Sequence, residues 1–247
     1  MHKGKIVSLV FATYKEKNSI RKAVEDFYKT GLVDEIVVVN NNAEEGTDVE
    51  VKKTKAVLIY EKRQGYGYAF LAGIRKAKGD LIVLCEPDGT FVGADLERFL
   101  VYAKDYEIVL GTRTGLSTPL SGADMGLLRK MANVIEAKTI EYLFNTNSLS
   151  DVGCTYKLFS KRILKKFAKI WRTHNSLFAT ELTLLAVSQN TNFIEIPVTF
   201  KKRVGVSTFT NTLYKMSKWG LRIYIFIFFF WLNWLTRKIL NGYKKNK

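Results

Sequence analysis

The chain has few of the residues on which several protein classes depend. Its 247 residues include only two cysteines, and Cys85 lies inside an apolar run whereas Cys154 does not. This usage does not indicate a disulfide framework and fits a reducing, cytosolic setting best. The apolar stretch at residues 6–12 is short and has no small-residue cleavage site after it, so it predicts a first strand and not a signal peptide. The two histidines, His2 and His174, lie outside every motif.

Acidic residues are also scarce, most of all towards the C-terminus. The chain has 39 Lys or Arg against 23 Asp or Glu, a formal net charge of +16. Residues 200–247 contain eleven basic residues and no acidic one, so this end alone carries +11. A basic end of this kind indicates an anionic partner, either nucleic acid or a membrane surface.

Apolar residues in the same tail favour a membrane. Residues 223–232 read IYIFIFFFWL, an unbroken aromatic and aliphatic run that does not resemble a nucleic-acid-binding surface. A helix over the 17 residues 219–235 would be about 25 Å long, short of the ~30 Å hydrocarbon core. We therefore expect a helix that lies in or dips into the membrane surface, held by apolar burial and basic flanks. The alternative is a helix buried in a homodimer.

Short apolar runs alternate with amphipathic stretches through the rest of the chain. Strands are predicted at 5–12, 35–39, 56–60, 81–85, 107–110 and 192–198, the last at a sheet margin. Helices are predicted at about 18–30, 64–78, 95–104, 126–144, 160–169 and 177–188, and a polar loop at 40–48. This alternation implies an α/β fold with a doubly wound, mainly parallel sheet. One domain would cover residues 1–207, followed by the C-terminal helix at 208–247.

The stretch Leu81–Cys85 is the most apolar of the predicted strands and is followed by two acidic residues. A run of this kind is typical of a strand buried on both faces. Glu86 and Asp88 come directly after it, where ligands bind in open α/β sheets. Two carboxylates there suit a hard divalent cation that also binds phosphates. The other interpretation is a polar turn built from Pro, Asp and Gly, and the stretch alone does not separate the two.

Polar side chains follow the other predicted strands as well. These residues are Thr13, Tyr14 and Glu16 after the first strand, Asn40 and Asn41 after the second, and Arg113 after the fifth. Each alone could be a loop residue or a helix cap. Because parallel strands end at one sheet edge, together they predict a cradle for a nucleotide.

Several segments, in order, resemble a known family. They are FATYKEKNSIRKAV, EIVVVNNNAEEGT, GYGYAFLAGIRKAKGD, EPDG, GTR, DVGCTYKLFSKRIL and PVTFKKRVGVS. Over about residues 5–207 the chain is similar to family-two glycosyltransferases of the GT-A fold, in the dolichyl-phosphate mannose or glucose synthase-like branch. The resemblance implies sugar transfer with inversion, from a UDP- or GDP-linked sugar and with Mg²⁺ or Mn²⁺. It implies a polyprenyl phosphate or other lipid acceptor at the cytoplasmic face of a membrane.

The resemblance also implies roles for individual residues. The positions matched to binding of the donor nucleotide are Thr13, Tyr14, Glu16, Asn40, Gly67 and Glu86. Asp88 would be the more direct metal ligand, with Glu86 beside it. The positions matched to catalysis are Asp88, Arg113, Arg129, Asp151 and Arg203.

Within that set, the basic residues divide between the two substrates. Arg113 and Arg129 would face the acceptor phosphate, and Arg203 would close over the phosphates of the donor. Asp151 and Glu181 match acidic positions near the acceptor and would supply a base if the acceptor were a hydroxyl. Salt-bridged or solvated helix residues are the alternative interpretation of Arg129 and Glu181.

The sequence departs from the family pattern at five places near these positions. After the first strand, Ala12 and Lys15 replace the Pro and Asn of the family's Pro-x-Tyr-Asn-Glu. Asn40 and Asn41 replace an acidic pair, Glu86 replaces Asp, Thr90 replaces Gln, and Thr208 replaces Lys. The loss of charge beside the base leaves open which nucleotide is bound. Two further functions therefore stay open: transfer to a glycan or lipid hydroxyl, and a catalytically weak, nucleotide-sugar-binding scaffold at a membrane.

Overall fold

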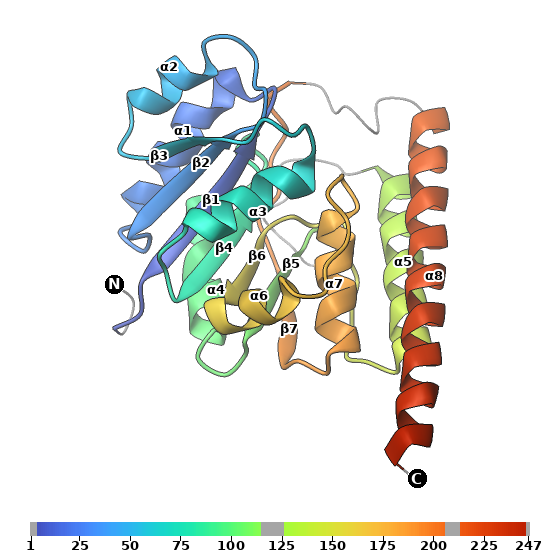
Figure 1. The fold of residues 1–247 in the computed structure, drawn as a ribbon. Coiled ribbons are helices and arrows are strands. Elements are labelled where there is room, and N and C mark those ends of the chain that lie inside the picture. Colours follow the sequence, from blue (N-terminus) through green and yellow to red (C-terminus); the bar gives the residue numbers. More distant parts are fainter. Residues whose placement is uncertain (1–3, 115–125, 206–212, 246–247) are drawn as a thin grey trace.

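The computed structural model describes residues 4–114, 126–205 and 213–245, which build one seven-stranded sheet with helices on both faces (Figure 1). The strands are β1 (Val7–Thr13), β2 (Glu35–Asn40), β3 (Val57–Tyr60), β4 (Leu81–Cys85), β5 (Ile108–Thr112), β6 (Lys157–Ser160) and β7 (Phe193–Pro197). Their order is β3-β2-β1-β4-β6-β5-β7, with β7 at the margin as predicted. Every pairing is parallel except those of β6, which runs antiparallel to β4 and β5. The predicted mainly parallel α/β fold is confirmed.

The helices pack in two layers. They are α1 (Lys17–Lys29), α2 (Thr47–Lys52), α3 (Tyr66–Lys76), α4 (Leu96–Tyr102), α5 (Leu127–Phe144), α6 (Lys161–Phe167), α7 (Phe178–Ser188) and α8 (Leu213–Lys245), with a short 3-10 turn at Gly93–Asp95. Buried residues of α1 and α4 share one apolar cluster with the sheet, and those of α3, α5, α6, α7 and α8 share the other. The sheet is therefore covered on both faces.

The central strands carry the burial that their composition predicts. All five residues of β4 are buried. In β1, Leu9 and Phe11 point into the cluster under α1 and α4, while Val10 points into the cluster on the opposite face. A strand with apolar neighbours on both faces needs a nearly continuous apolar run, which explains why these strands are readable from sequence.

Two elements were not predicted. The strand β6 is four residues long, contains Lys157, and inserts antiparallel between β4 and β5, so it breaks the strand–helix alternation on which the prediction rested. The helix α2 has six residues, of which only Thr47 and Val51 are buried. Such a short helix depends on tertiary contacts and leaves little periodic signal.

The C-terminal helix α8 packs along the domain beside α5 and α7 (Figure 1). Ile223 and Ile227 are buried in the same apolar cluster as α5 and α7. Two indole N–H groups fix the contact: Trp231 donates to the Leu143 carbonyl at 2.9 Å, and Trp234 to the Ser188 carbonyl at 3.1 Å. By length and composition α8 could cross a membrane. The proposed domain boundary at 207 and 208 lies outside the described residues.

Candidate active site

Asp88 is held at the exit of β4 with one carboxylate oxygen already bound. Its Oδ1 accepts hydrogen bonds from the Thr90 amide at 3.0 Å and the Thr90 hydroxyl at 2.6 Å. Gly89 makes the intervening turn at φ +82°, a conformation that favours glycine. The turn buries Asp88 and leaves Oδ2 to face the sheet edge.

Arg203 joins three carboxylates at this edge. Its Nη1 atom lies 3.2 Å from Asp88 Oδ2 and 3.9 Å from Glu86 Oε2, and its Nη2 atom lies 3.2 Å from Glu16 Oε1. Two backbone hydrogen bonds fix the segment that carries Arg203: Lys201 N–H donates to the Thr90 carbonyl at 2.8 Å, and Val204 N–H to the Asp88 carbonyl at 2.9 Å. The guanidinium therefore occupies the point on which Glu16, Glu86 and Asp88 converge.

This convergence fits a divalent cation. Glu86 and Asp88 direct oxygens at the same nitrogen of Arg203, and carboxylate oxygens are the ligands that Mg²⁺ and Mn²⁺ prefer. Within the described residues no group of three or more His, Cys, Asp or Glu is placed to hold a metal by itself. One or two carboxylates completed by substrate phosphates are the usual arrangement for Mg²⁺ in nucleotide sites. Glu86 and Asp88 would hold the ion in this way.

Glu86 is a weaker acid than an ordinary glutamate. Burial, together with the negative charge of Asp88, raises its pKa from 4.5 to about 7, although Arg203 opposes the shift. The Tyr66 hydroxyl, at the start of α3, also interacts with Glu86. A neighbouring cation would favour the ionised form of Glu86.

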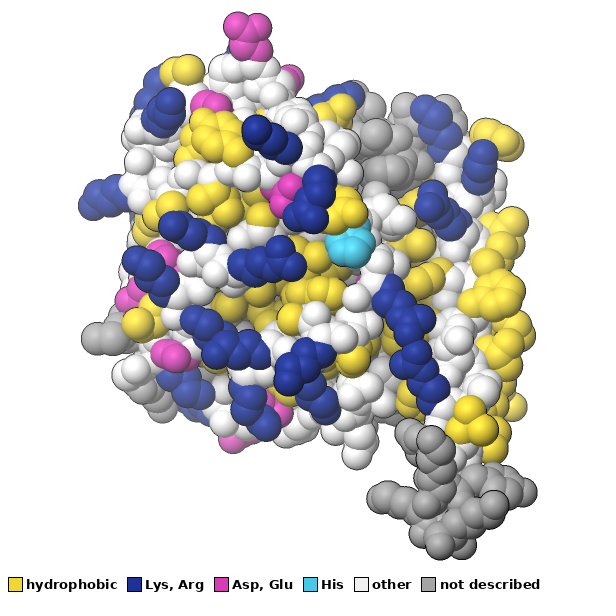
Figure 2. Space-filling model, in the orientation of Figure 1, with side chains coloured by type: hydrophobic (Ala, Val, Ile, Leu, Met, Phe, Trp, Pro, Cys, Tyr) yellow, Lys and Arg dark blue, Asp and Glu magenta, His cyan; other side chains and the backbone are white. Residues whose placement is uncertain are grey.

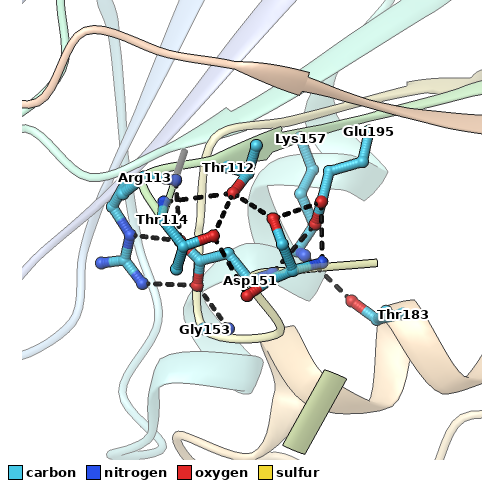
Figure 3. A network of polar contacts seen from close by, with 9 residues as sticks. Thr112, Arg113, Thr114, Asp151, Gly153, Lys157, Thr183 and Glu195 are labelled. Carbon is cyan, nitrogen blue, oxygen red and sulfur yellow. Dashed lines mark hydrogen bonds and ion pairs between the residues drawn. The ribbon is translucent and has the colours of Figure 1, made fainter. Parts of the chain in front are cut away.

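Arg113 and Asp151 form a second, buried charged pair beyond the end of β5 (Figure 3). Arg113 Nε donates to Asp151 Oδ2 at 2.7 Å and its Nη2 to Oδ1 at 2.9 Å. Asp151 also accepts from the Arg113 amide at 3.0 Å and the Gly153 amide at 3.1 Å. Burial alone would raise the pKa of Asp151, but the Arg113 charge and these hydrogen bonds hold it below its ordinary value.

The half-buried Glu195 and the buried Lys157 and Thr183 lie close to this pair (Figure 3). The Glu195 carboxylate on β7 accepts from the Ser150 and Asp151 amides at 2.8 and 3.0 Å. Lys157 Nζ, on β6, donates to the Thr183 hydroxyl of α7 at 2.9 Å. Burial lowers the pKa of Lys157 and raises that of Glu195. Glu195 on β7 thus holds the loop that carries Asp151, whereas Lys157 ties β6 to α7.

The comparisons with known proteins agree with this arrangement. The model of glycosyl transferase family 2 matches residues 8–168. The chain belongs to glycosyl transferase family 2. It is 24% identical over 201 residues to the dolichyl-phosphate hexose transferase of Haloferax volcanii, covering 81% of this chain and 84% of that protein. It is 23% identical over 229 residues to the dolichyl-phosphate beta-glucosyltransferase of Saccharomyces cerevisiae, covering 81% and 68%.

A solved structure shows the same fold. Glucosyl-3-phosphoglycerate synthase from Mycobacterium tuberculosis, in complex with Mn²⁺, uridine diphosphate and phosphoglyceric acid, superposes with a TM-score of 0.69 at 12% identity. The match covers 90% of this chain and 76% of that one. The predicted GT-A fold and the identification as a glycosyltransferase are confirmed.

In this glycosyltransferase the predicted donor residues of β1 lie beside the carboxylate cluster. Glu16 Oε2 accepts from the Tyr14 and Lys15 amides at 2.7 and 2.9 Å and from the Thr13 hydroxyl at 3.3 Å. Glu16 thereby orders the loop after β1 while its other oxygen faces Arg203. The Tyr14 ring stays exposed, with the Lys15 ammonium 5.4 Å from its centre.

Two asparagines at the end of β2 organise loops: Asn40 is the last residue of the strand, and Asn41 follows it. Asn40 donates to Asp48 and accepts from the Ala43 amide at 2.8 Å. Asn41, which is buried, donates to the Glu61 and Arg63 carbonyls, both at 2.8 Å, and accepts from the Gly65 amide at 2.9 Å. The side-chain amides are thus engaged with the chain itself at the place where the family has acidic residues.

Gly67 lies against the loop before α7. Its amide donates to the His174 carbonyl at 2.9 Å. A Cβ on Gly67 would lie 2.7 Å from His174 Cα, which is backbone and cannot turn aside. The His174 ring stacks on Tyr68 at 4.3 Å. Sequence reasoning gave His174 no role. The paired glycines at 65 and 67 signal a close approach, but they do not name the partner.

The two other residues predicted to lie on the acceptor side, Arg129 and Glu181, differ in what they contact. Arg129 is in the first turn of α5, one turn before Asn133, whose Oδ1 would lie 3.0 Å from a Cβ on Gly153. This face of α5 therefore borders the loop of Asp151. Glu181 instead accepts from the Arg172 and Thr173 amides, both at 2.7 Å, and from the Thr173 hydroxyl. Its bonds belong to the loop before α7.

Proposed function

We propose that the chain transfers a sugar from a nucleotide-sugar donor to a polyprenyl phosphate, with inversion, at the cytoplasmic face of a membrane. The observation that carries this proposal is the pair of neighbouring sites at one sheet edge. A carboxylate cluster converges on the cation of Arg203, and Arg113 lies at the exit of the nearby strand β5. The curated relatives named above supply the acceptor class.

At the donor side, the charge that develops on the departing diphosphate must be balanced. A divalent ion held by Asp88 and Glu86 would supply Lewis-acid stabilisation of that diphosphate. Arg203 lies within 4 Å of both carboxylates. It could also pair with a donor phosphate, because a guanidinium binds phosphate as well as carboxylate. Thr13, Tyr14, Glu16, Asn40 and Gly67 would border the nucleotide.

At the acceptor side, no general base is required for a phosphate. Its oxygen is already anionic, so the protein has to position it and limit the repulsion from the donor phosphates. Arg113 and Arg129 would do so. Asp151 and Glu181 are poorly placed to act as a base, because Asp151 already accepts four hydrogen bonds and Glu181 three. A direct attack opposite the leaving diphosphate inverts the anomeric centre.

The lipid acceptor also accounts for the exposed side of α8. Large apolar residues line its outer face along the edge of the molecule (Figure 2): Leu221, Tyr224, Ile225, Phe228, Phe229, Leu232, Ile239 and Leu240. The neighbouring helix α5 exposes Leu127, Leu128, Met131, Ile135 and Tyr142. An exposed apolar surface of this extent marks an interaction site. We propose that it lies against the bilayer, as a peripheral or monotopic anchor.

Sugar transfer tests the reaction directly. A panel of UDP- and GDP-sugars would be offered with a short polyprenyl phosphate, with Mg²⁺, with Mn²⁺ and with chelator, and the matching polyprenol serves as the hydroxyl control. We expect transfer to the phosphate only, and only with metal, and an inverted anomeric configuration by NMR. Transfer to the polyprenol would support the hydroxyl alternative. Nucleotide binding without transfer or donor hydrolysis would support the scaffold.

Vesicle flotation tests the membrane contact. Phe228→Glu and Leu232→Glu place charges on the outer face of α8 and should release the protein from vesicles. Val49→Glu changes an apolar residue of α2 that is at least as exposed and should leave binding intact. If the two α8 variants instead convert a dimer to a monomer in light scattering while vesicle binding persists, the helix serves dimerisation and the membrane proposal is wrong.

A further inference from the structure

A cavity of about 550 Å³ lies between α7 and α8. Its lining comes from α7, α8 and the loop before α7, none of which carries Glu86, Asp88, Arg113 or Arg203. The apolar part of the lining includes Leu185, Phe226 and Trp234. A volume of this size is ordinary for a site that binds a small molecule.

The charged part of the lining is mainly basic. Arg172, Arg237 and Lys238 line the cavity, and Lys238 Nζ lies 4.9 Å from the centre of the Trp234 ring. The one acid in the lining is Glu181, and both its oxygens already accept hydrogen bonds from Arg172 and Thr173. The cavity therefore offers three cations and no uncommitted carboxylate to an occupant.

The cavity opens beside the surface proposed to contact the membrane. On α8 its lining includes positions 226, 230, 233 and 237, whose spacing of three and four residues defines one helix face. Phe229 belongs both to this lining and to the outer apolar face, where it is 56% exposed. Basic side chains are visible on the side of the molecule where α7 and α8 lie together (Figure 2). Apolar surface and basic groups thus meet at one rim.

We propose that this cavity binds an anionic phospholipid of the bilayer, with the phosphate at Arg172, Arg237 and Lys238 and the start of a chain against Phe226 and Trp234. The inference rests on the membrane contact proposed above and adds a specific lipid site to it. Arginine is suited to the phosphate because its planar guanidinium makes paired, charge-assisted hydrogen bonds. The indole N–H of Trp234 is already bound to the Ser188 carbonyl, so that ring offers an apolar surface.

Binding of monomeric lipid separates a built site from general attraction to an anionic membrane. Dihexanoyl phosphatidylglycerol, below its micelle-forming concentration, would be titrated into the full chain and followed by calorimetry. Dihexanoyl phosphatidylcholine and inorganic phosphate serve as parallel ligands. We expect saturable binding of the phosphatidylglycerol. The other two ligands should bind at least about tenfold more weakly, since phosphatidylcholine lacks the net negative charge and inorganic phosphate lacks the acyl chain. Equal binding of inorganic phosphate would overturn the lipid assignment, and so would the absence of phosphatidylglycerol binding.

Charge-matched variants complete the test. Arg172→Gln and Arg237→Gln should each weaken phosphatidylglycerol binding about tenfold, the usual consequence of losing one charge-assisted hydrogen bond. Lys218→Gln and Arg222→Gln remove the same charge from α8 outside the cavity lining and should bind as the parent does. An equal loss in all four variants would show general electrostatics and refute the site. The titration requires no donor, so its failure is distinct from a failure of sugar transfer.

Discussion

Asp88 and Arg203 meet across the carboxyl edge of the sheet, with 3.2 Å between Oδ2 and Nη1. The pairing sets the charge balance of the site, because Arg203 is also within 4 Å of Glu16 and Glu86. Three carboxylates around one guanidinium leave a net negative charge. A second cation is therefore favoured at this edge, and the predictions for the donor side follow from that imbalance.

Replacing Asp88 by Asn should abolish metal-dependent transfer. The amide keeps an oxygen for the Thr90 amide, which Asp88 Oδ1 binds at 3.0 Å, but it removes the charge that would hold the ion. Because metal stabilisation is worth several kcal/mol, we expect a loss of about 100-fold or more in kcat. Glu97→Gln removes an exposed acid from α4 and should turn over normally. Full activity of the Asp88 variant would remove the metal assignment.

Replacing Asp151 by Ala should destabilise the domain strongly. The change leaves the Arg113 guanidinium, whose side chain is 16% exposed, without its carboxylate partner. Loss of one partner from a buried pair costs about 3–5 kcal/mol. Glu25→Ala breaks the Arg21–Glu25 pair, whose side chains are 49% and 54% exposed, and should change stability little, because water and salt screen exposed pairs. Denaturant unfolding of both variants measures the contrast, and similar losses would contradict it.

Glu136 should make stability fall as the pH rises. This residue of α5 is 5% exposed, and burial together with the charge of Asp151 raises its pKa from 4.5 to about 8. Between these two values the folded chain binds more protons than the unfolded chain, so the free energy of unfolding decreases with pH over this window.

Glu136→Gln removes that ionisation and keeps the shape of the side chain. The variant should match the parent near pH 4.5 and exceed its stability by an amount on the order of a few kcal/mol above pH 8. Denaturant unfolding at several values of pH gives the comparison. A stability difference that does not change with pH would show that Glu136 stays ionised in the folded chain.

Replacing Gly67 by Ala should disturb both the fold and donor binding. The new Cβ would lie 2.7 Å from His174 Cα, so backbone must move, at a cost of about 1–3 kcal/mol. The shift would displace the start of α3 and weaken nucleotide binding. Gly220→Ala is the control, because its Cβ meets Glu136 Oε1 at an ordinary 3.7 Å and alanine favours a helix interior by about 1 kcal/mol. An unchanged melting temperature for Gly67→Ala would contradict the close approach.

The predictable part of the fold is the part with local signals. The buried strand β4, bounded by Gly79-Asp80 and Pro87-Asp88, was identified from composition and its flanking turns and ends at Cys85 as expected. The Ser160 side chain caps α6 by accepting the Ile163 amide at 3.3 Å, close to the predicted start of that helix. By contrast, β6 was missed because its pairing with β4 and β5 joins distant segments and because this four-residue strand begins with a lysine.

In the site, too, local features were predictable from the sequence and contacts between distant segments were not. The position of Glu86 and Asp88 just beyond a strand follows from the sequence, whereas their shared partner Arg203 depends on how the segment after β7 crosses the sheet edge. Asp151 and Glu181 look alike as acidic residues in the sequence. Only their hydrogen bonds show that one holds Arg113 and the other the loop before α7.

The sequence by itself determined the buried strands other than β6, the longer amphipathic helices, the acidic exit of β4, and the basic, aromatic character of the tail. Those features depend on the periodicity and composition of residues that are close together in the sequence. The tertiary structure alone decided which charges meet, which carboxylates are already bound, and that α7 and α8 enclose a basic cavity. Contacts between distant segments set all three, and spacing along the chain does not encode them.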